Sequence, residues 1–278
     1  MAVARSKRAD RSITETMTLL VDSHLHLDHR RFDQDRELVV ARARRHGVQA
    51  MVVPAVDRRS WHAIADLANR HPDVFPAYGL HPMFQEQHRV EDLDALPDWL
   101  DAHPAVAVGE IGLDYFVEHA DREAQQRYFS RQLAIAGERR LPVIIHARRA
   151  VDAVILAVRR APGLRGVVHS FSGSDEQARQ LLDLGFLLGL GGPLTYPGAH
   201  RLHRLVAAMP IEQLLLESDA PDQPGVEHRG ERNEPAWVRT TLSHVARLRD
   251  EDEAAVAAAT SANAERLFRL SAFRERHA

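Results

Sequence analysis

The sequence of 278 residues contains no cysteine. Disulfide bonds and thiolate metal ligands are therefore excluded, and a metal site would have to use imidazole and carboxylate groups. No apolar run approaches the ~18 residues that a transmembrane helix needs, so we expect no membrane segment and a cytoplasmic location. An excess of basic residues is also missing, because 36 Lys and Arg stand against 39 Asp and Glu. A nucleic-acid ligand would then have to be held by a local patch and by metal.

Short apolar runs alternate with amphipathic stretches from residue 19 onward, as they do in repeated βα units. The apolar runs predict strands at residues 19–26, 49–55, 74–81, 105–114, 142–148, 166–171, 186–191 and 214–219. Eight such units predict an α/β fold, a TIM (β/α)8 barrel in a single domain. The alternative is a doubly wound open sheet, which is disfavoured because no G-x-G-x-x-G turn follows the first strand.

The ends of the chain differ in composition from this repeating region. Residues 1–18 carry several charges and few apolar side chains, which predicts a disordered extension. The barrel domain is expected at residues 19–270, with a split terminal helix at 251–258 and 261–270. Residues 271–278 are predicted as a C-terminal tail.

Metal-ligating side chains recur at the C-terminal ends of the predicted strands, where TIM barrels place their active sites. They are His24, His26, His81, Glu110, His146, His169 and Asp219. Each alone has an ordinary structural explanation, such as a hydrogen-bonded core histidine, but the whole set predicts a site. His24 and His26 are two residues apart and would share a face of an extended chain, so they can hold one ion together.

The number of these side chains favours more than one ion. Four imidazoles and two carboxylates exceed the ligand set of a single ion with an open position. They suit two divalent ions bridged by a carboxylate, an arrangement that supports phosphodiester cleavage. Asp219 can both bind an ion and orient or deprotonate the attacking water. Ligand type favours Zn, Mn or Fe.

Six motifs in order, D-S-H-L-H-L-D, Y-G-L-H-P, G-E-I-G-L-D-Y, I-I-H-A-R, V-V-H-S-F-S-G and L-L-L-E-S-D-A-P, resemble the TatD family over about residues 19–270. The resemblance implies a metal-dependent hydrolase of the amidohydrolase superfamily with deoxyribonuclease activity. It implies a first ion on His24, His26, Glu110 and Asp219, and a second ion on Glu110, His146 and His169. It further implies that His81 and Arg148 line the phosphate-binding side.

The chain departs from the family pattern at two places, of which the second bears on the substrate. Ser170 stands where a Cys is common, and the segment 191–197, G-G-P-L-T-Y-P, lacks a basic residue that many members carry there. Aromatic residues on the loops above the site could stack on a base or simply pack the loops. They are Tyr115, Phe116, Phe171 and Tyr196.

We therefore expect Asp219 and Glu110 to be catalytic and the substrate to be DNA, at ends or in single strands, or another phosphodiester. The first alternative is hydrolysis of a small ester, lactone, amide or aminoacyl ester by the same metals, since one barrel supports many reactions. The second is a non-catalytic binding module, which no basic helix or known binding motif supports. No obligate protein partner is predicted.

Overall fold

The structure, a computed structural model, describes residues 19–116, 118 and 120–277. The segment 1–18, for which the sequence predicts an extension, lies outside the described residues. The described strands form one parallel sheet of eight that runs in chain order from β1 to β8. They are β1 (Leu20–Asp22), β2 (Val48–Pro54), β3 (Val74–Tyr78), β4 (Ala107–Asp114), β5 (Val143–Arg148), β6 (Gly166–Val168), β7 (Phe186–Leu190) and β8 (Leu214–Leu216). This nearly closed barrel confirms the predicted TIM-barrel fold.

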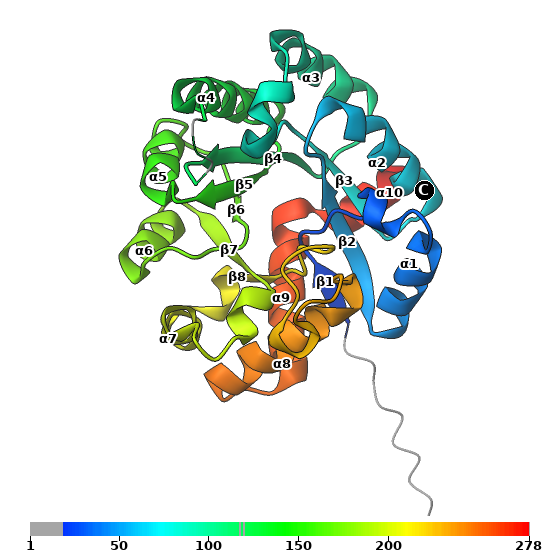
Figure 1. Ribbon diagram of the computed structural model, residues 1–278, viewed down its shortest axis with the longest axis vertical. Coiled ribbons are helices and arrows are strands. Elements are labelled where there is room, and N and C mark those ends of the chain that lie inside the picture. Colours follow the sequence, from blue (N-terminus) through cyan, green and yellow to red (C-terminus); the bar gives the residue numbers. More distant parts are fainter. Residues whose placement is uncertain (1–18, 117, 119, 278) are drawn as a thin grey trace, which may run out of the picture.

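Helices surround the ring of strands, and Figure 1 shows them in order around it. They are α1 (Arg36–Arg45), α2 (Arg58–Arg70), α3 (Val90–Ala102), α4 (Arg122–Arg139), α5 (Val151–Arg159), α6 (Asp175–Asp183), α7 (His200–Ala208), α8 (Val238–Arg249), α9 (Glu253–Phe268) and α10 (Leu270–His277). None of these described helices combines the length and the apolarity that a membrane crossing requires.

The barrel closes between its first and last strands through a polar seam. Ser23 donates its backbone N–H to Leu216 O at 3.0 Å. The buried carboxylate of Asp22 accepts hydrogen bonds from Ser218 N at 2.9 Å and from Ser218 Oγ at 2.6 Å. Just beyond the seam, Asp219 N donates to the carbonyl oxygen of His24 at 2.9 Å. The seam therefore holds two of the predicted ligands next to each other.

The opposite end of the barrel, where the strands begin, is covered by α9 and α10. Figure 1 shows α9 in red-orange within the outline of the ring of strands. Leu267, Phe268 and Phe273 belong to the same buried apolar cluster as inward-facing strand residues such as Phe75. Asn263 Nδ2 donates to the carbonyl oxygens of Ile211 and Leu214, at 2.7 and 2.9 Å, and so fixes α9 beside the start of β8.

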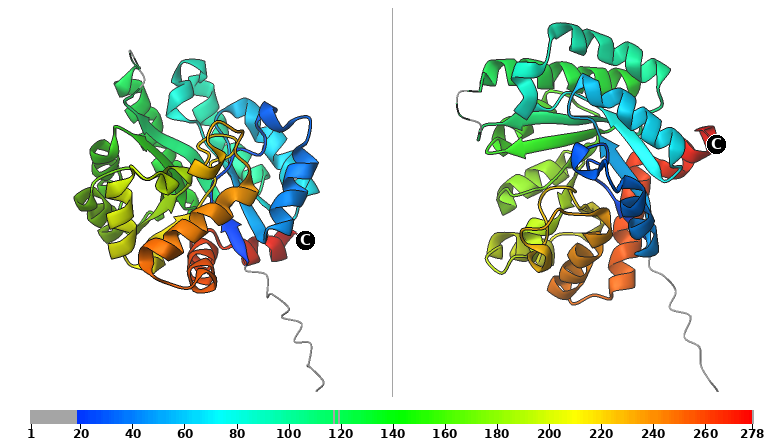
Figure 2. Two further views of the ribbon diagram at one scale, coloured as in Figure 1. Left: turned by 60° about the horizontal axis from the view of Figure 1, so that its bottom comes forward. Right: turned by 45° about the vertical axis from the view of Figure 1, so that its right-hand side comes forward.

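Two expectations about the C-terminal region are corrected or refined. The split terminal helix is wrong, because α9 continues through the expected break; Thr260 Oγ1 donates to Val256 O at 2.9 Å within it. Most of the segment 271–278 forms α10, whose side chain Phe273 is buried. Figure 2 shows this C-terminal helix, in red, lying against the barrel.

Candidate metal centre

Glu110 lies at the middle of the predicted ligand set. An irregularity in β4 between Val108 and Ile111 shifts its register against β5. Ala107 and Glu110, three positions apart, can therefore both point into the barrel. Gly112 makes the next close approach possible, because a Cβ atom there would lie 2.1 Å from the carbonyl oxygen of His146. The motif G-E-I-G-L-D thus serves to bring one carboxylate and one histidine into a single crowded site.

Three imidazoles surround one oxygen of the Glu110 carboxylate. Glu110 Oε1 lies 2.8 Å from His81 Nε2, 2.8 Å from His169 Nε2 and 3.2 Å from His146 Nδ1. His146 Nδ1 and His169 Nε2 are themselves 3.3 Å apart. These three histidines come from the C-terminal ends of β3, β5 and β6.

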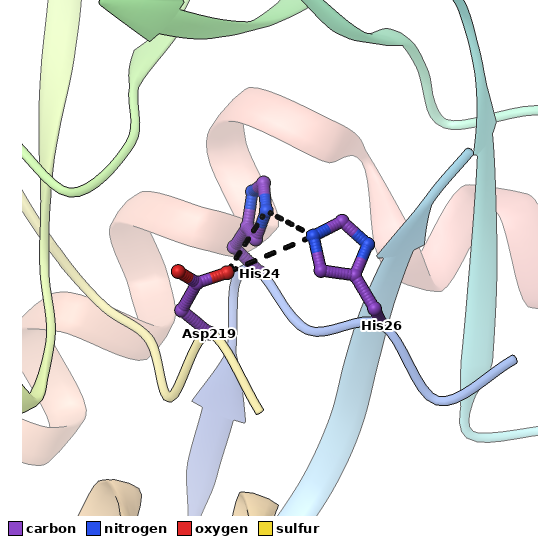
Figure 3. Close-up of side chains that lie close together, drawn as sticks. All are labelled: His24, His26 and Asp219. Carbon is purple, nitrogen blue, oxygen red and sulfur yellow. Dashed lines mark hydrogen bonds and ion pairs between the residues drawn. The ribbon is translucent and has the colours of Figure 1, made fainter. Parts of the chain in front are cut away.

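The other oxygen faces the H-x-H pair. Glu110 Oε2 lies 3.2 Å from His24 Nε2 and 3.4 Å from His26 Nε2. Asp219 Oδ1 lies 3.6 and 3.7 Å from the same two nitrogens, and Figure 3 shows the three side chains converging on one point. The strand that was predicted to reach residue 26 ends at Asp22. The two rings therefore meet edge to face, at an interplanar angle of 87°, with their Nε2 atoms 3.4 Å apart.

The arrangement fits divalent cations. Glu110 Oε2 is buried and accepts no hydrogen bond from the residues that the structure describes. Ligand atoms of His24, His26 and Asp219 all lie within 4.8 Å of one another, and those of His24, Glu110 and His169 do so as well. Imidazole nitrogens combined with carboxylate oxygens are common ligands of Zn, Mn and Fe. The donor set and the unpaired carboxylate oxygen are therefore what a cation site requires.

Hydrogen bonds behind the rings orient two of the histidines, and a carboxylate faces the ring of a third. His26 Nδ1 faces Pro54 O at 3.3 Å, and His146 Nε2 faces Asp114 Oδ2 at 2.9 Å. His169 Nδ1 lies 3.7 Å from Glu217 Oε1. Because each acceptor favours a proton on the nitrogen that faces it, the other nitrogen presents its lone pair to the site.

His81 has the opposite orientation. Its Nδ1 accepts the backbone N–H of Met83 at 3.0 Å, so the proton of the neutral ring sits on Nε2 and points toward Glu110. Burial lowers the pKa of His81 to about 4, which keeps the ring neutral at pH 7. His81 therefore presents a hydrogen-bond donor to the site, although its position would also allow it to be a ligand.

The pKa values of the acids and of His26 follow from this crowding. Burial disfavours the ionised form of Glu110, but the imidazoles that surround it, His81 and His169 foremost, hold the pKa of its carboxyl well below the usual value. Burial raises the pKa of Asp219 to about 6. Burial alone would lower the pKa of His26, but the carboxylates of Glu110 and Asp219 beside it outweigh this and raise the pKa to about 9. Without a cation, protons on the imidazoles balance the buried carboxylates, and a cation would replace them.

The site opens into a pocket of about 650 Å³. Its lining includes His26, His81, Glu110, His146, Arg148, His169 and Asp219. His24 is fully buried beneath it, with its ring stacked on that of His169 at 3.9 Å between centroids. All eight predicted site residues are therefore gathered at one end of the barrel, with Arg148 at the exposed edge.

Sequence reasoning missed three residues that contact this set. Asp114 and Glu217, described above, orient His146 and His169. Gln223 accepts a hydrogen bond from Ser170 Oγ at 2.8 Å and donates from Nε2 to Asp219 Oδ2. Asp114 and Glu217 carried a signal, because a carboxylate in an apolar strand needs a partner. Gln223 lies in a loop and carried none.

Comparison with known proteins decides the family. Residues 21–269 match the sequence profile of a family described as TatD related DNase. The chain belongs to the TatD family. An uncharacterized metal-dependent hydrolase, YjjV of Escherichia coli (strain K12), is 38% identical over 253 residues, which cover 90% of this chain and 98% of that protein. The crystal structure of the TatD homologue YjjV superposes with a TM-score of 0.88 at 36% identity and covers 91% of this chain and 99% of that one.

A further TatD relative bears on the chemistry. The 3'-5' ssDNA/RNA exonuclease TatD of Erwinia tasmaniensis is 32% identical over 259 residues, which cover 90% of this chain and all of that protein. These likenesses confirm the predicted family and identify this TatD protein as a metal-dependent hydrolase.

Proposed function

We propose that this protein hydrolyses phosphodiester bonds of DNA, releasing nucleotides from ends or single strands, with two divalent cations. The observation that carries this proposal is the presence of two phosphate-binding donors, His81 Nε2–H and the Arg148 guanidinium, in the same pocket as the ligand cluster. Guanidinium groups match phosphate geometry. The exonuclease name of the relative from Erwinia tasmaniensis supports the same substrate class.

The position of the ring proton separates the histidines that would be ligands from His81, which donates a hydrogen bond. His24, His26 and Asp219 with Glu110 would hold one cation, and Glu110 with His146 and His169 would hold the other. They are sites for Mg, Mn or Zn. When bound, such cations lower the pKa of water and neutralise charge on phosphate oxygens. His81 is left out of the ligand set because its Nε2 carries the proton.

The protein groups then perform the remaining steps. The His81 Nε2–H that faces Glu110 would be available to a non-bridging oxygen of the phosphate once cations hold the Glu110 oxygens, and Arg148 would bind another. Asp219 takes the proton of the attacking water on Oδ2, while Gln223 holds that carboxylate in place. The water oxygen bonds to phosphorus, the P–O bond to the leaving sugar breaks, and the leaving oxygen takes a proton from solvent.

The test is hydrolysis of DNA oligonucleotides labelled at the 5′ or the 3′ end by metal-stripped protein, with Mg, Mn or Zn added back. We expect metal-dependent nucleotide release that is lost in Glu110→Gln and kept in Glu91→Gln, an exposed carboxylate on α3. The order of label release gives the polarity. Absence of release with every metal, from protein shown to bind its ions, would refute the proposal.

A second candidate is hydrolysis of a small carboxyl ester or lactone, and one observation favours it. The pocket wall formed by the loops after β6 and β7 is apolar, with Phe171, Pro193, Leu194 and Leu202 among its lining residues. Metal-activated water attacks carbonyl carbon as well as phosphorus. Two results together would select this alternative. The wild-type protein would cleave no DNA, and the Arg148→Ala variant would cleave aryl or aminoacyl esters as fast as the wild-type protein does.

A further inference from the structure

An unusual group of side chains lies beside the pocket, where β4 and β5 end. Tyr115 and Phe116 follow β4, Arg148 and Arg149 lie at the end of β5, and Arg122 begins α4. The two strands are paired, and Figure 1 shows them side by side with α4 outside them. We call these five residues the arginine–aromatic patch.

The aromatic rings of the patch are covered by guanidinium groups. Arg148 Cζ lies 3.7 Å and Arg149 Cζ lies 4.6 Å from the centroid of the Phe116 ring. Arg122 Cζ lies 4.6 Å from the centroid of Tyr115. Such stacking holds each guanidinium by its face and leaves the N–H groups at its edge for a ligand.

The backbone is shaped to bring two successive arginines onto one ring. Successive residues of a strand point to opposite faces, but Arg149 has φ +52°, in the left-handed region. That conformation costs a non-glycine residue about 1 kcal/mol. Tyr115 N also donates to Arg148 O at 2.9 Å, which locks the aromatic segment to the arginine segment. Strained residues that the surrounding structure enforces are concentrated at functional sites.

The charge of the patch is not neutralised within the described chain. Arg122, Arg148 and Arg149 are exposed, and no described carboxylate lies within 4.0 Å of their guanidinium groups. Two neighbouring acids are engaged elsewhere, Asp114 with His146 and Asp121 with Arg127. In a chain with a net charge of −3, this is a local cationic surface of the kind that a nucleic acid would require.

The position of the patch defines what it can bind. Arg148 lines the pocket, whereas Arg122 and Arg149 do not, so the positive charge begins at the metal centre and leads outward along one rim. On the other side of the pocket, Arg31 and Arg201 are bound within the chain, Arg31 to Asp222 at 2.8 Å and Arg201 to the carbonyl oxygen of Ser172. The guanidinium groups of the patch therefore form one track of cations, which a single phosphate backbone can follow.

We propose that the arginine–aromatic patch binds the phosphates that adjoin the scissile one along the same strand of an oligonucleotide. This inference rests on the proposed phosphodiesterase function. The sequence left Phe116 open between stacking on a base and packing a loop; in the structure arginines stack on its ring, and we assign it the role of their support. Arg148 holds the phosphate at the cleavage site, and Arg149 and Arg122 hold those that follow.

The test is binding of fluorescein-labelled oligothymidylates of two and eight nucleotides, measured by fluorescence anisotropy over a range of salt concentrations. The protein carries Glu110→Gln to prevent cleavage, alone or with Arg122→Ala and Arg149→Ala. The matched control replaces Arg160 and Arg165, which are exposed near the opposite end of the barrel. Thermal melting verifies that each variant is folded.

We expect the double variant to bind the octamer roughly tenfold more weakly at low salt, with a much smaller effect on the dimer. The slope of log affinity against log salt should fall by about 1.4, since each phosphate contact with a single strand contributes about 0.7. An octamer affinity and slope equal to those of the control pair, or no octamer binding to the parent protein, would overturn the proposal. If binding depends on the arginines but the wild-type protein cleaves no DNA, the proposed reaction fails and the patch stands. If the wild-type protein cleaves DNA but oligonucleotide binding does not depend on Arg122 and Arg149, the proposed role of the patch fails and the proposed reaction stands.

Discussion

Replacing Asp114 by Asn should weaken metal binding without unfolding the protein. Asp114 is fully buried and uses both carboxylate oxygens: Oδ1 accepts the N–H of Phe116 at 2.9 Å, and Oδ2 faces His146 Nε2 at 2.9 Å. Asparagine offers only one acceptor oxygen. The backbone N–H of Phe116 cannot change, whereas the imidazole of His146 can exchange its tautomer. The amide NH2 will therefore face His146 and force its proton onto Nδ1, which turns an N–H toward the metal centre.

The expected loss of metal affinity follows from the loss of the partner that orients one proposed ligand, His146. Loss of the partner that orients a ligating histidine typically weakens metal affinity 10–100-fold, which corresponds to about 1.4–2.7 kcal/mol. The free energy of unfolding of the metal-free protein should change by less than about 1 kcal/mol, because the side chain keeps its shape and its bond to Phe116. Calorimetric titration of the metal-free variant with Mn²⁺ and Zn²⁺ measures the first quantity, and urea unfolding measures the second.

Asp121→Asn is the matched control, because Asp121 caps α4 through Ala124 N at 2.9 Å and asparagine is an equally good cap. Metal affinity of Asp114→Asn within twofold of the wild type would refute the reasoning about the tautomer. An equal loss in both variants would show that the effect is unspecific.

Three further predictions concern protons, positioning and stability. Metal affinity should rise with pH by up to tenfold per unit between pH 6 and 9. In this range a cation must displace the proton of His26, whose pKa is raised to about 9. Below pH 6 the metal affinity should fall more steeply, because Asp219 also takes a proton there. Titrations in buffers of different ionisation enthalpy count the released protons, and a pH-independent affinity would contradict this. Gln223→Leu should lower kcat for the phosphodiester about tenfold or more, because Asp219 loses its hydrogen-bond donor and a hydrogen bond to a charged group contributes about 1.5–3 kcal/mol. The measurement is the steady-state rate of the variant, and Gln177→Leu, on α6, serves as the control. Phe273→Ala should cost about 3 kcal/mol of stability, since this ring packs edge-on against Phe75 at 5.6 Å beneath the barrel; a loss below about 1 kcal/mol in urea unfolding would show that α10 contributes little to the core.

The strands and the clustering of the strand-end side chains were predictable from the sequence for related reasons. A parallel strand covered on both faces must be apolar along its length, so a charged or imidazole side chain at its end stands out against that background. All seven strand-end side chains expected to form a site lie around Glu110 or the pocket beside it. The mistakes concern where regular structure stops. β1 was expected to continue to residue 26, but Asp22 accepts hydrogen bonds from Ser218 and from His24 N, and these replace the sheet ladder.

The features that were not predictable depend on contacts between distant parts of the chain. The support of Asp219 by Gln223, and of Gln223 by Ser170, arises in loops whose residues have no periodic pattern. Ser170, Asp219 and Gln223 all have positive φ, at +44°, +54° and +50°, although none of them is a glycine. Only the folded surroundings enforce such conformations, and no local sequence signal announces them. The same holds for the arginine–aromatic patch, which joins two loops through stacking.

The polar seam of the barrel has a consequence for how the protein is made. Asp22 and Ser218 are 196 positions apart, and His24 and Asp219 are joined across the same seam. During synthesis the carboxylate of Asp22 therefore has no Ser218 partner until almost the whole barrel has left the ribosome. Contacts of such long sequence separation form slowly, because loop closure precedes any gain from them. A nascent or truncated chain thus has no complete metal centre, and binding of the cation is reserved for molecules that have finished folding.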